Sequence, residues 1–153
     1  MAVATRLTDQ ERRDRALSER DFQRQVTDLA TALGWSYAHW RALQNRRGMW
    51  QVPVEGPLGK GWVDLTLLRV RDRRLIFAEL KRELEHPTAD QAAVLAALGA
   101  LDHCPSGMHG TGPASWTEGL AAPAGAPCVA TYVWRPSDLR DPIEDSVIGR
   151  VLR

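Results

Sequence analysis

Three charged residues interrupt two segments that are otherwise typical of buried β-strands. Asp64 lies in the apolar segment 62–70, and Glu79 and Lys81 lie at the end of the apolar segment that begins at residue 74. An unpaired charge in a protein core costs several kcal/mol in practice, so folded chains normally avoid it. Three such residues in neighbouring segments therefore indicate a site.

The spacing of the two segments predicts how these side chains meet. They read as antiparallel strands joined by a tight turn, and a turn centred on Arg71 and Asp72 places Asp64 opposite Glu79. Side chains alternate along a strand, so Glu79 and Lys81 share a face. Directly opposed residues have Cβ atoms about 4.5–5.5 Å apart. We therefore expect two adjacent carboxylates with a lysine beside them.

Two ionised carboxylates at this distance repel each other unless a cation lies between them. Mg²⁺ is the natural candidate, with Mn²⁺ as its substitute, because it takes oxygen ligands and is typically held by one or two carboxylates, waters and substrate phosphates. Lys81 would then be placed to orient or help deprotonate a metal-bound water. The alternative is a cross-strand ion pair of Asp64 and Lys81, with Glu79 solvated at a sheet edge.

The composition is typical of a folded soluble protein, with 44% hydrophobic and 25% charged residues in a chain of 153. The sequence has no run of about 18 apolar residues and no signal-peptide pattern near its start. The two cysteines, Cys104 and Cys128, fit a reducing compartment. We therefore expect a cytoplasmic protein without membrane contact.

The charge balance gives one narrower indication. The net charge of +1 does not by itself indicate a partner, but Lys60 and Lys81 are the only lysines among 20 basic residues. Lysine carries a compact charge and a tunable pKa. In a chain that uses arginine almost everywhere else, a lysine two residues after Glu79 favours a specific role.

Local patterns predict a polar arm at 1–17 followed by one domain at 18–153. Ser18 can cap a helix that Gly34 ends, and Thr88 with Gln91 forms a capping box for a second helix. Strands are expected at 35–40, 62–70, 74–80 and 128–134, and the connection at 41–60 can include a strand at 50–54. A Gly/Pro-rich insertion is expected at about 102–127, and Asp141–Pro142 is expected to open a last helix.

The order of these elements is α-β-β-β-α-β-α. A strand, crossover helix and strand in one sheet imply a parallel connection, whereas the preceding hairpin is antiparallel. The fold class is therefore α/β, with a mixed sheet flanked by helices on both faces.

Five segments in this order resemble the VRR-NUC branch of the PD-(D/E)XK, or restriction endonuclease-like, superfamily of phage and bacterial nucleases. They are SERDFQRQVTDLATALGW, GWVDLTLLR, LIFAELKRE, TADQAAVL and VWRPSDL, and the resemblance covers roughly residues 18–139 without 41–60 and 102–127. The resemblance implies an α-β-β-β-α-β core. It also implies that Asp64 and Glu79 are metal ligands, with the backbone carbonyl of Leu80 as a third, and that Lys81 is the catalytic lysine.

Two further catalytic residues follow from the same resemblance. Glu19 would be the first-helix acid that reaches the metal directly or through water, and Gln91 would be the polar residue of the helix after the Glu-x-Lys strand. Both residues also have structural interpretations. An acid such as Glu19 in a first helical turn gains from the helix dipole, and Gln91 is already explained by the capping box. The sequence leaves both interpretations open.

The implied activity is Mg²⁺-dependent hydrolysis of DNA phosphodiester bonds through a metal-activated water, by an endonuclease that is structure-specific or Holliday-junction-like. Branched or double-stranded DNA would be the partner, and relatives that resolve junctions act as homodimers. Arginines near the site would bind phosphates, unless they are simply solvated loop and turn residues. They are Arg41, Arg46, Arg47, Arg69 and Arg82.

The alternative function is a catalytically idle nucleic-acid-binding or phage assembly protein that keeps the nuclease fold. Val63 stands where the family usually has a proline, and the long insertion is a second departure. The residues His103, Cys104, His109 and Cys128 are of zinc-ligand type, but their spacing fits no familiar zinc pattern.

Overall fold

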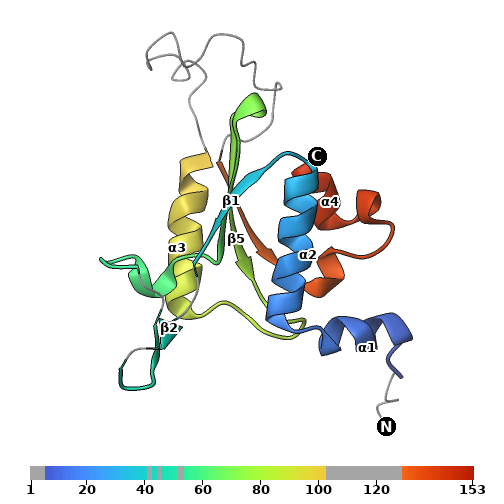
Figure 1. Ribbon diagram of the computed structural model, residues 1–153, viewed down its shortest axis with the longest axis horizontal. Helices are drawn as coiled ribbons and strands as arrows, with labels where there is room; N and C mark the ends of the chain where they lie inside the picture. The colour runs from blue at the N-terminus through green and yellow to red at the C-terminus, as the bar shows by residue number, and fades with distance from the viewer. Residues whose placement is uncertain (1–5, 41–42, 45, 52–53, 103–128) are drawn as a thin grey trace.

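A mixed sheet of four strands forms the centre of the protein (Figure 1). The computed structural model describes residues 6–40, 43–44, 46–51, 54–102 and 129–153. Within them the strand order is β1 (Ser36–His39), β4 (Leu65–Arg69), β5 (Arg74–Leu80) and β6 (Val129–Trp134). The pairs β1–β4 and β4–β5 are antiparallel, and β5–β6 is parallel. The predicted α/β class with a mixed sheet is therefore confirmed.

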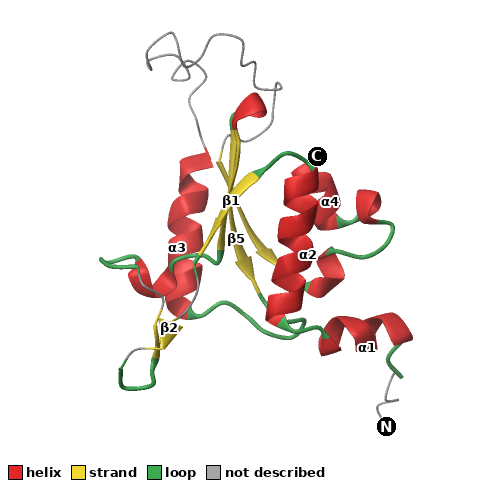
Figure 2. Ribbon diagram, in the orientation of Figure 1, coloured by secondary structure: helices red, strands yellow, loops and turns green. Residues whose placement is uncertain are grey.

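Helices cover both faces of this sheet (Figures 1 and 2). The helices α2 (Glu19–Ala32) and α4 (Val147–Leu152) lie on one face, and α3 (Ala89–Gly99) lies on the other. Alternate residues of β5 serve the two faces, since Ile76 packs in the α2 core and Phe77 in the α3 core. Glu79 follows Phe77 by two residues, so it lies on the α3 face.

The two longer helices begin where their capping residues predict. Ser18 accepts the backbone N–H of Asp21, and Gly34 has the left-handed φ of 79° that ends α2. Thr88 and Gln91 form both hydrogen bonds of a capping box at the start of α3. These local signals need no distant partner, and they place Glu19 and Gln91 in the first turns of their helices.

The N-terminal arm contains a short helix, α1 (Asp9–Ala16), capped by Thr8 with Glu11. Asp14 is buried and pairs with Arg140 at 2.7 Å. This ion pair joins α1 to the segment that follows β6, so the part of the arm from residue 6 onward packs on the domain.

The prediction for the last helix was wrong at its start. Ile143–Asp145 forms a 3₁₀ turn instead, and α4 begins at Val147 with Ser146 as its N-cap. The backbone of Pro142 is extended, with ψ 134°, while the Ser146 hydroxyl accepts the N–H of Gly149 at 2.9 Å. Of two competing caps, the one whose side-chain oxygen reaches a free helix N–H starts the helix.

The connection between β1 and β4 contains a second small sheet, β2 (Leu43–Gln44) paired with β3 (Trp50–Gln51), and a 3₁₀ turn, η1 (Gly59–Gly61). The strand expected at 50–54 is seen at its first two residues. Residues 103–128, with the cysteines, His103 and His109, lie outside the described residues, as does Arg41. In the part of the chain that is described, no helix is long and apolar enough to cross a bilayer.

Arg69 is buried, with 2% of its surface exposed, which contradicts its expected role in binding phosphates. Its Nε donates to both carboxylate oxygens of Asp72 at 2.8–2.9 Å. Its Nη1 and Nη2 donate to the carbonyls of Leu152 and Arg153 at 2.6 and 2.7 Å, and its guanidinium lies 4.5 Å from the centre of the Trp35 ring. Arg69 therefore fastens the end of α4 to the hairpin.

We expect Arg69→Ala to lower the free energy of unfolding by about 3–5 kcal/mol, because it leaves a buried network without its cation. Urea denaturation measures this change. Arg150→Ala, which removes an exposed arginine of α4, is the matched control and should change stability by no more than about 0.5 kcal/mol. Equal stability of the two variants would contradict the role given to Arg69.

Candidate active site

The β4–β5 hairpin has the register predicted from the sequence. Its pairs run from Arg69↔Arg74 to Leu65↔Ala78, so Arg71 and Asp72 occupy the middle of the turn. The hydrogen-bonded ladder ends at Leu65, and Asp64 lies one position beyond it. Continuing the same register places Asp64 opposite Glu79. The two carboxylates are therefore brought together at the end of the hairpin, as the pairing predicted.

Asp64 is held against the end of β5 by its side chain. Its Oδ2 accepts the backbone N–H of Leu80 at 2.8 Å. The carboxylate thus takes an N–H at the point where the backbone ladder stops. Its own carbonyl accepts the N–H of Trp40, at 3.4 Å, beyond the end of β1. These contacts fix Asp64 between two strands rather than leaving it on a loose loop.

The carboxylate of Glu79 is completely buried, with an exposed fraction of 0%. Its Oε1 accepts hydrogen bonds from Lys81 Nζ and Gln91 Nε2, each at 2.5 Å. Its Oε2 is also buried and has no hydrogen-bond partner among the described residues. β5 lies between β4 and β6, so the alternative of a solvated Glu79 at a sheet edge is wrong. Lys81 forms an ion pair with Glu79.

The acidic groups of the site affect one another. The pKa of Glu79 is raised from 4.5 to about 7, mainly by burial and then by the charge of Asp64, while the hydrogen bond from Lys81 opposes both. The pKa of Glu19 is also raised, first by partial removal from water and then by the charge of Asp64. Glu19 lies at the surface in the first turn of α2. The helix therefore brings a third acid close to the pair.

Gln91 completes the expected capping box and contacts Glu79 with the same amide group. Its Oε1 accepts the backbone N–H of Thr88 at 2.8 Å and completes the capping box. Its Nε2 donates to Glu79. The cap fixes the side chain of Gln91, and the fixed side chain then holds one oxygen of the buried carboxylate.

Three of the predicted phosphate-binding arginines are exposed near this end of the molecule. Arg46 and Arg47 occupy the turn between β2 and β3, which Figure 1 places at the same end as the first turns of α2 and α3. Arg82 follows Lys81, and its Nη1 lies 4.0 Å from Glu85 Oε1. The charge of Arg82 lowers the pKa of Glu19. Glu85 raises that pKa and was not predicted. It lies in a turn without periodicity, so no sequence signal placed it.

No protein-family model, no curated protein and no solved structure matches this chain.

We expect the stability of the protein, without divalent cations, to fall as pH rises from about 4.5 to about 7 because of Glu79. In this range the folded state retains a proton that the unfolded state has lost, so the contribution is complete below 4.5 and absent above 7. At roughly 1.4 kcal/mol per pKa unit, the loss is about 3 kcal/mol.

Glu79→Gln is the variant that isolates this contribution, since glutamine keeps the size of the side chain and cannot ionise. Urea unfolding of both proteins between pH 5 and pH 8 gives the comparison. The wild type should lose stability relative to the variant as pH rises. Parallel curves would contradict the raised pKa.

Proposed function

We propose that this protein is a Mg²⁺-dependent nuclease that hydrolyses DNA phosphodiester bonds, acting as an endonuclease through a metal-activated water. The observation that carries the proposal is the buried carboxylate of Glu79, which lies next to Asp64 and has one oxygen without a partner among the described residues. The resemblance of the five sequence segments to VRR-NUC nucleases supports it.

The donor set fits a hard cation. The unpartnered Oε2 of Glu79 is buried beside a second carboxylate, an arrangement that is unfavourable without a positive charge. In the part of the chain that is described, no three His, Cys, Asp or Glu side chains are grouped closely enough to hold a metal by themselves. Mg²⁺ needs only one or two carboxylates, because waters and substrate phosphates complete its coordination. Asp64 and Glu79 would be those ligands.

Backbone geometry and α2 supply two further oxygen donors. In an extended strand the N–H and C=O of a residue point to the same neighbouring strand. The N–H of Leu80 points to Asp64, so its carbonyl belongs to the same side and would be the third ligand. Glu19 would reach the ion directly or through a water. These four oxygen donors, from Asp64, Glu79, Leu80 and Glu19, are the set of metal ligands that the resemblance implies.

A bound Mg²⁺ would supply a Lewis acid that lowers the pKa of water and offsets charge on the scissile phosphate. Lys81 donates to Glu79 Oε1, so its ammonium is held beside the carboxylates, and 13% of its side chain is exposed. From there it can donate to a phosphate oxygen and stabilise the charge that develops on it. Gln91 donates to the same oxygen of Glu79 and so holds the carboxylate partner of Lys81 in place.

The exposed arginines would contribute to a surface for the substrate. Arg46, Arg47 and Arg82 would neutralise backbone phosphates, and Arg41, expected to do the same, lies outside the described residues. Such contacts bind DNA without reading its sequence, which favours recognition of DNA structure. A homodimer would present two such sites for paired cuts in a junction.

We expect the wild type to nick plasmid and branched DNA in Mg²⁺ or Mn²⁺, and we expect Asp64→Ala and Lys81→Ala to cut at least about a hundred-fold more slowly. Each variant removes a group that acts on the charge formed in the transition state. Gel electrophoresis of the products measures the rates. Glu144→Ala removes an acid that is exposed and outside the site, and it should cut like the wild type.

Equal nicking by the wild type, Asp64→Ala and Lys81→Ala would refute the proposal, because the activity would then come from another protein. Binding of DNA without any cutting would favour the idle nucleic-acid-binding protein instead.

Val63 is compatible with both the nuclease and the idle nucleic-acid-binding protein. It is buried against Phe77 and Leu95, so a branched apolar side chain fills the position that a proline would take.

A further inference from the structure

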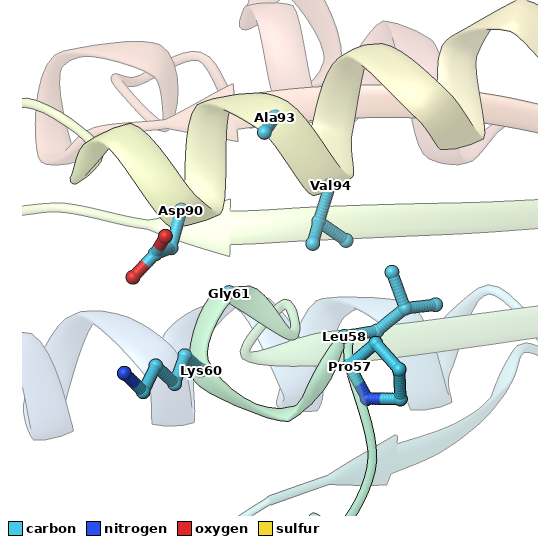
Figure 3. A pocket seen from close by; sticks show the side chains of 7 residues that line it. All are labelled: Pro57, Leu58, Lys60, Gly61, Asp90, Ala93 and Val94. Atoms are coloured by element: carbon cyan, nitrogen blue, oxygen red, sulfur yellow. The ribbon is translucent and has the colours of Figure 1, made fainter.

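A groove of about 190 Å³ lies between η1 and the first turns of α3 (Figure 3). Leu58 and Val94 form its apolar end, with Pro57 beside them, and Lys60 and Asp90 lie at the other end. Leu58 is 49% exposed although it is a large apolar residue. The sequence singled out Lys60 as one of two lysines, and the proposed catalytic arrangement does not use it.

The groove is formed by the close packing of η1 against α3 at Gly61. A Cβ atom at Gly61 would lie 2.2 Å from the backbone carbonyl oxygen of Asp90 and 2.9 Å from Val94 Cγ2. Only glycine allows this approach. Gly59 is equally constrained, since its Cβ would lie 2.2 Å from the carbonyl oxygen of Val54. The walls of the groove are therefore fixed by backbone contacts.

Lys60 and Asp90 are both exposed, and neither makes a side-chain hydrogen bond or ion pair with another residue in the described ranges. Lys60 can thus bind an anion, and Asp90 can accept a hydrogen bond from a neutral donor. A negatively charged ligand without a hydrogen-bond donor would be repelled by the carboxylate of Asp90. A ligand that carries a phosphate, an N–H or O–H group and a flat apolar ring matches all three parts of the groove.

The volume suits one small ring system, because pockets for drug-sized ligands are usually about 300–1,000 Å³. The groove is also close to the candidate active site. Asp90 immediately precedes Gln91, whose amide reaches Glu79, and Val94 follows less than one turn later. One helical turn is about 5.4 Å, so the groove begins within roughly that distance of Gln91 along α3.

We infer that this groove binds one unpaired nucleotide of the DNA strand next to the cut, with its base against Leu58 and Val94 and its phosphate on Lys60. This inference depends on the proposed nuclease function. A paired base is stacked and hydrogen-bonded in the duplex, so only an unpaired or extruded nucleotide can enter. Asp90 would accept a hydrogen bond from the amino group of the base. The groove would make the enzyme favour flaps, bulges and junctions over continuous duplex.

The test uses a DNA duplex with one unpaired 2-aminopurine nucleotide and the same duplex fully paired, both in EDTA so that no cutting occurs. The wild type should bind the unpaired duplex more tightly and change its 2-aminopurine fluorescence. Leu58→Trp fills the groove and should weaken binding of the unpaired duplex about five-fold or more, because the base is then excluded from its apolar contacts. Binding of the paired duplex should not change.

The matched controls are Leu101→Trp, at an exposed leucine in the 3₁₀ turn that follows the end of α3, and Arg150→Gln. Leu101→Trp should bind both duplexes like the wild type. Lys60→Gln should lower the slope of log affinity against log salt by about 0.9, the value for one lost phosphate contact. Arg150→Gln should leave that slope unchanged. Equal urea unfolding of Leu58→Trp and wild type shows that the variant folds.

Failure of this inference is distinct from failure of the nuclease proposal. If the wild type cuts plasmid DNA but Leu58→Trp keeps the preference for the unpaired duplex, the groove is not the subsite and the nuclease stands. If the wild type prefers the unpaired duplex and Leu58→Trp loses that preference, nucleotide binding in the groove is supported. A failed cutting assay would then overturn the nuclease proposal and, with it, the position of that nucleotide next to a cut. A wild type that binds both duplexes equally overturns the inference.

Discussion

Burial of the Glu79 carboxylate in the middle of the sheet is the constraint on which the surrounding structure depends. The charge is removed from water by β4 and β6 on either side and by α3 above. Such a group is tolerated only with compensating partners. Lys81 from the same strand and Gln91 from α3 satisfy one of its oxygens, and Asp64 lies beside the pair. The positions of β4, β5 and α3 are thus linked to the side chain of Glu79.

This arrangement stabilises the site incompletely. One oxygen of Glu79 has no partner in the described residues, and the neighbouring Asp64 and the burial both raise the pKa of the group to about 7. A fold that needed only an ion pair would gain more from an apolar residue of the same volume. Local cost of this kind is common where a site is preorganised for a ligand. A divalent cation would remove the cost and complete the charge balance.

The parts of the fold set by local rules could be predicted from the sequence. The caps at Ser18 and Thr88 act within three residues, and the register of β4 and β5 follows from side-chain alternation and a short turn, so Asp64 and Glu79 were placed correctly. Contacts between distant segments could not be predicted. The sequence predicts a phosphate-binding role for Arg69, because its partners in α4 and Trp35 are remote in the sequence. The start of α4 was misplaced because two cap signals compete within six residues.

Proton release on metal binding tests the central claim most directly. Calorimetric titration with Mg²⁺ or Mn²⁺, in buffers of different ionisation enthalpy, counts the protons released for each ion bound. At pH 6, below the raised pKa of Glu79, the wild type should release close to one proton, and at pH 8 almost none. Glu79→Gln should release clearly fewer protons than the wild type at pH 6. Binding with no proton release at pH 6, or no binding at either pH, would contradict a metal site built on this buried carboxylate.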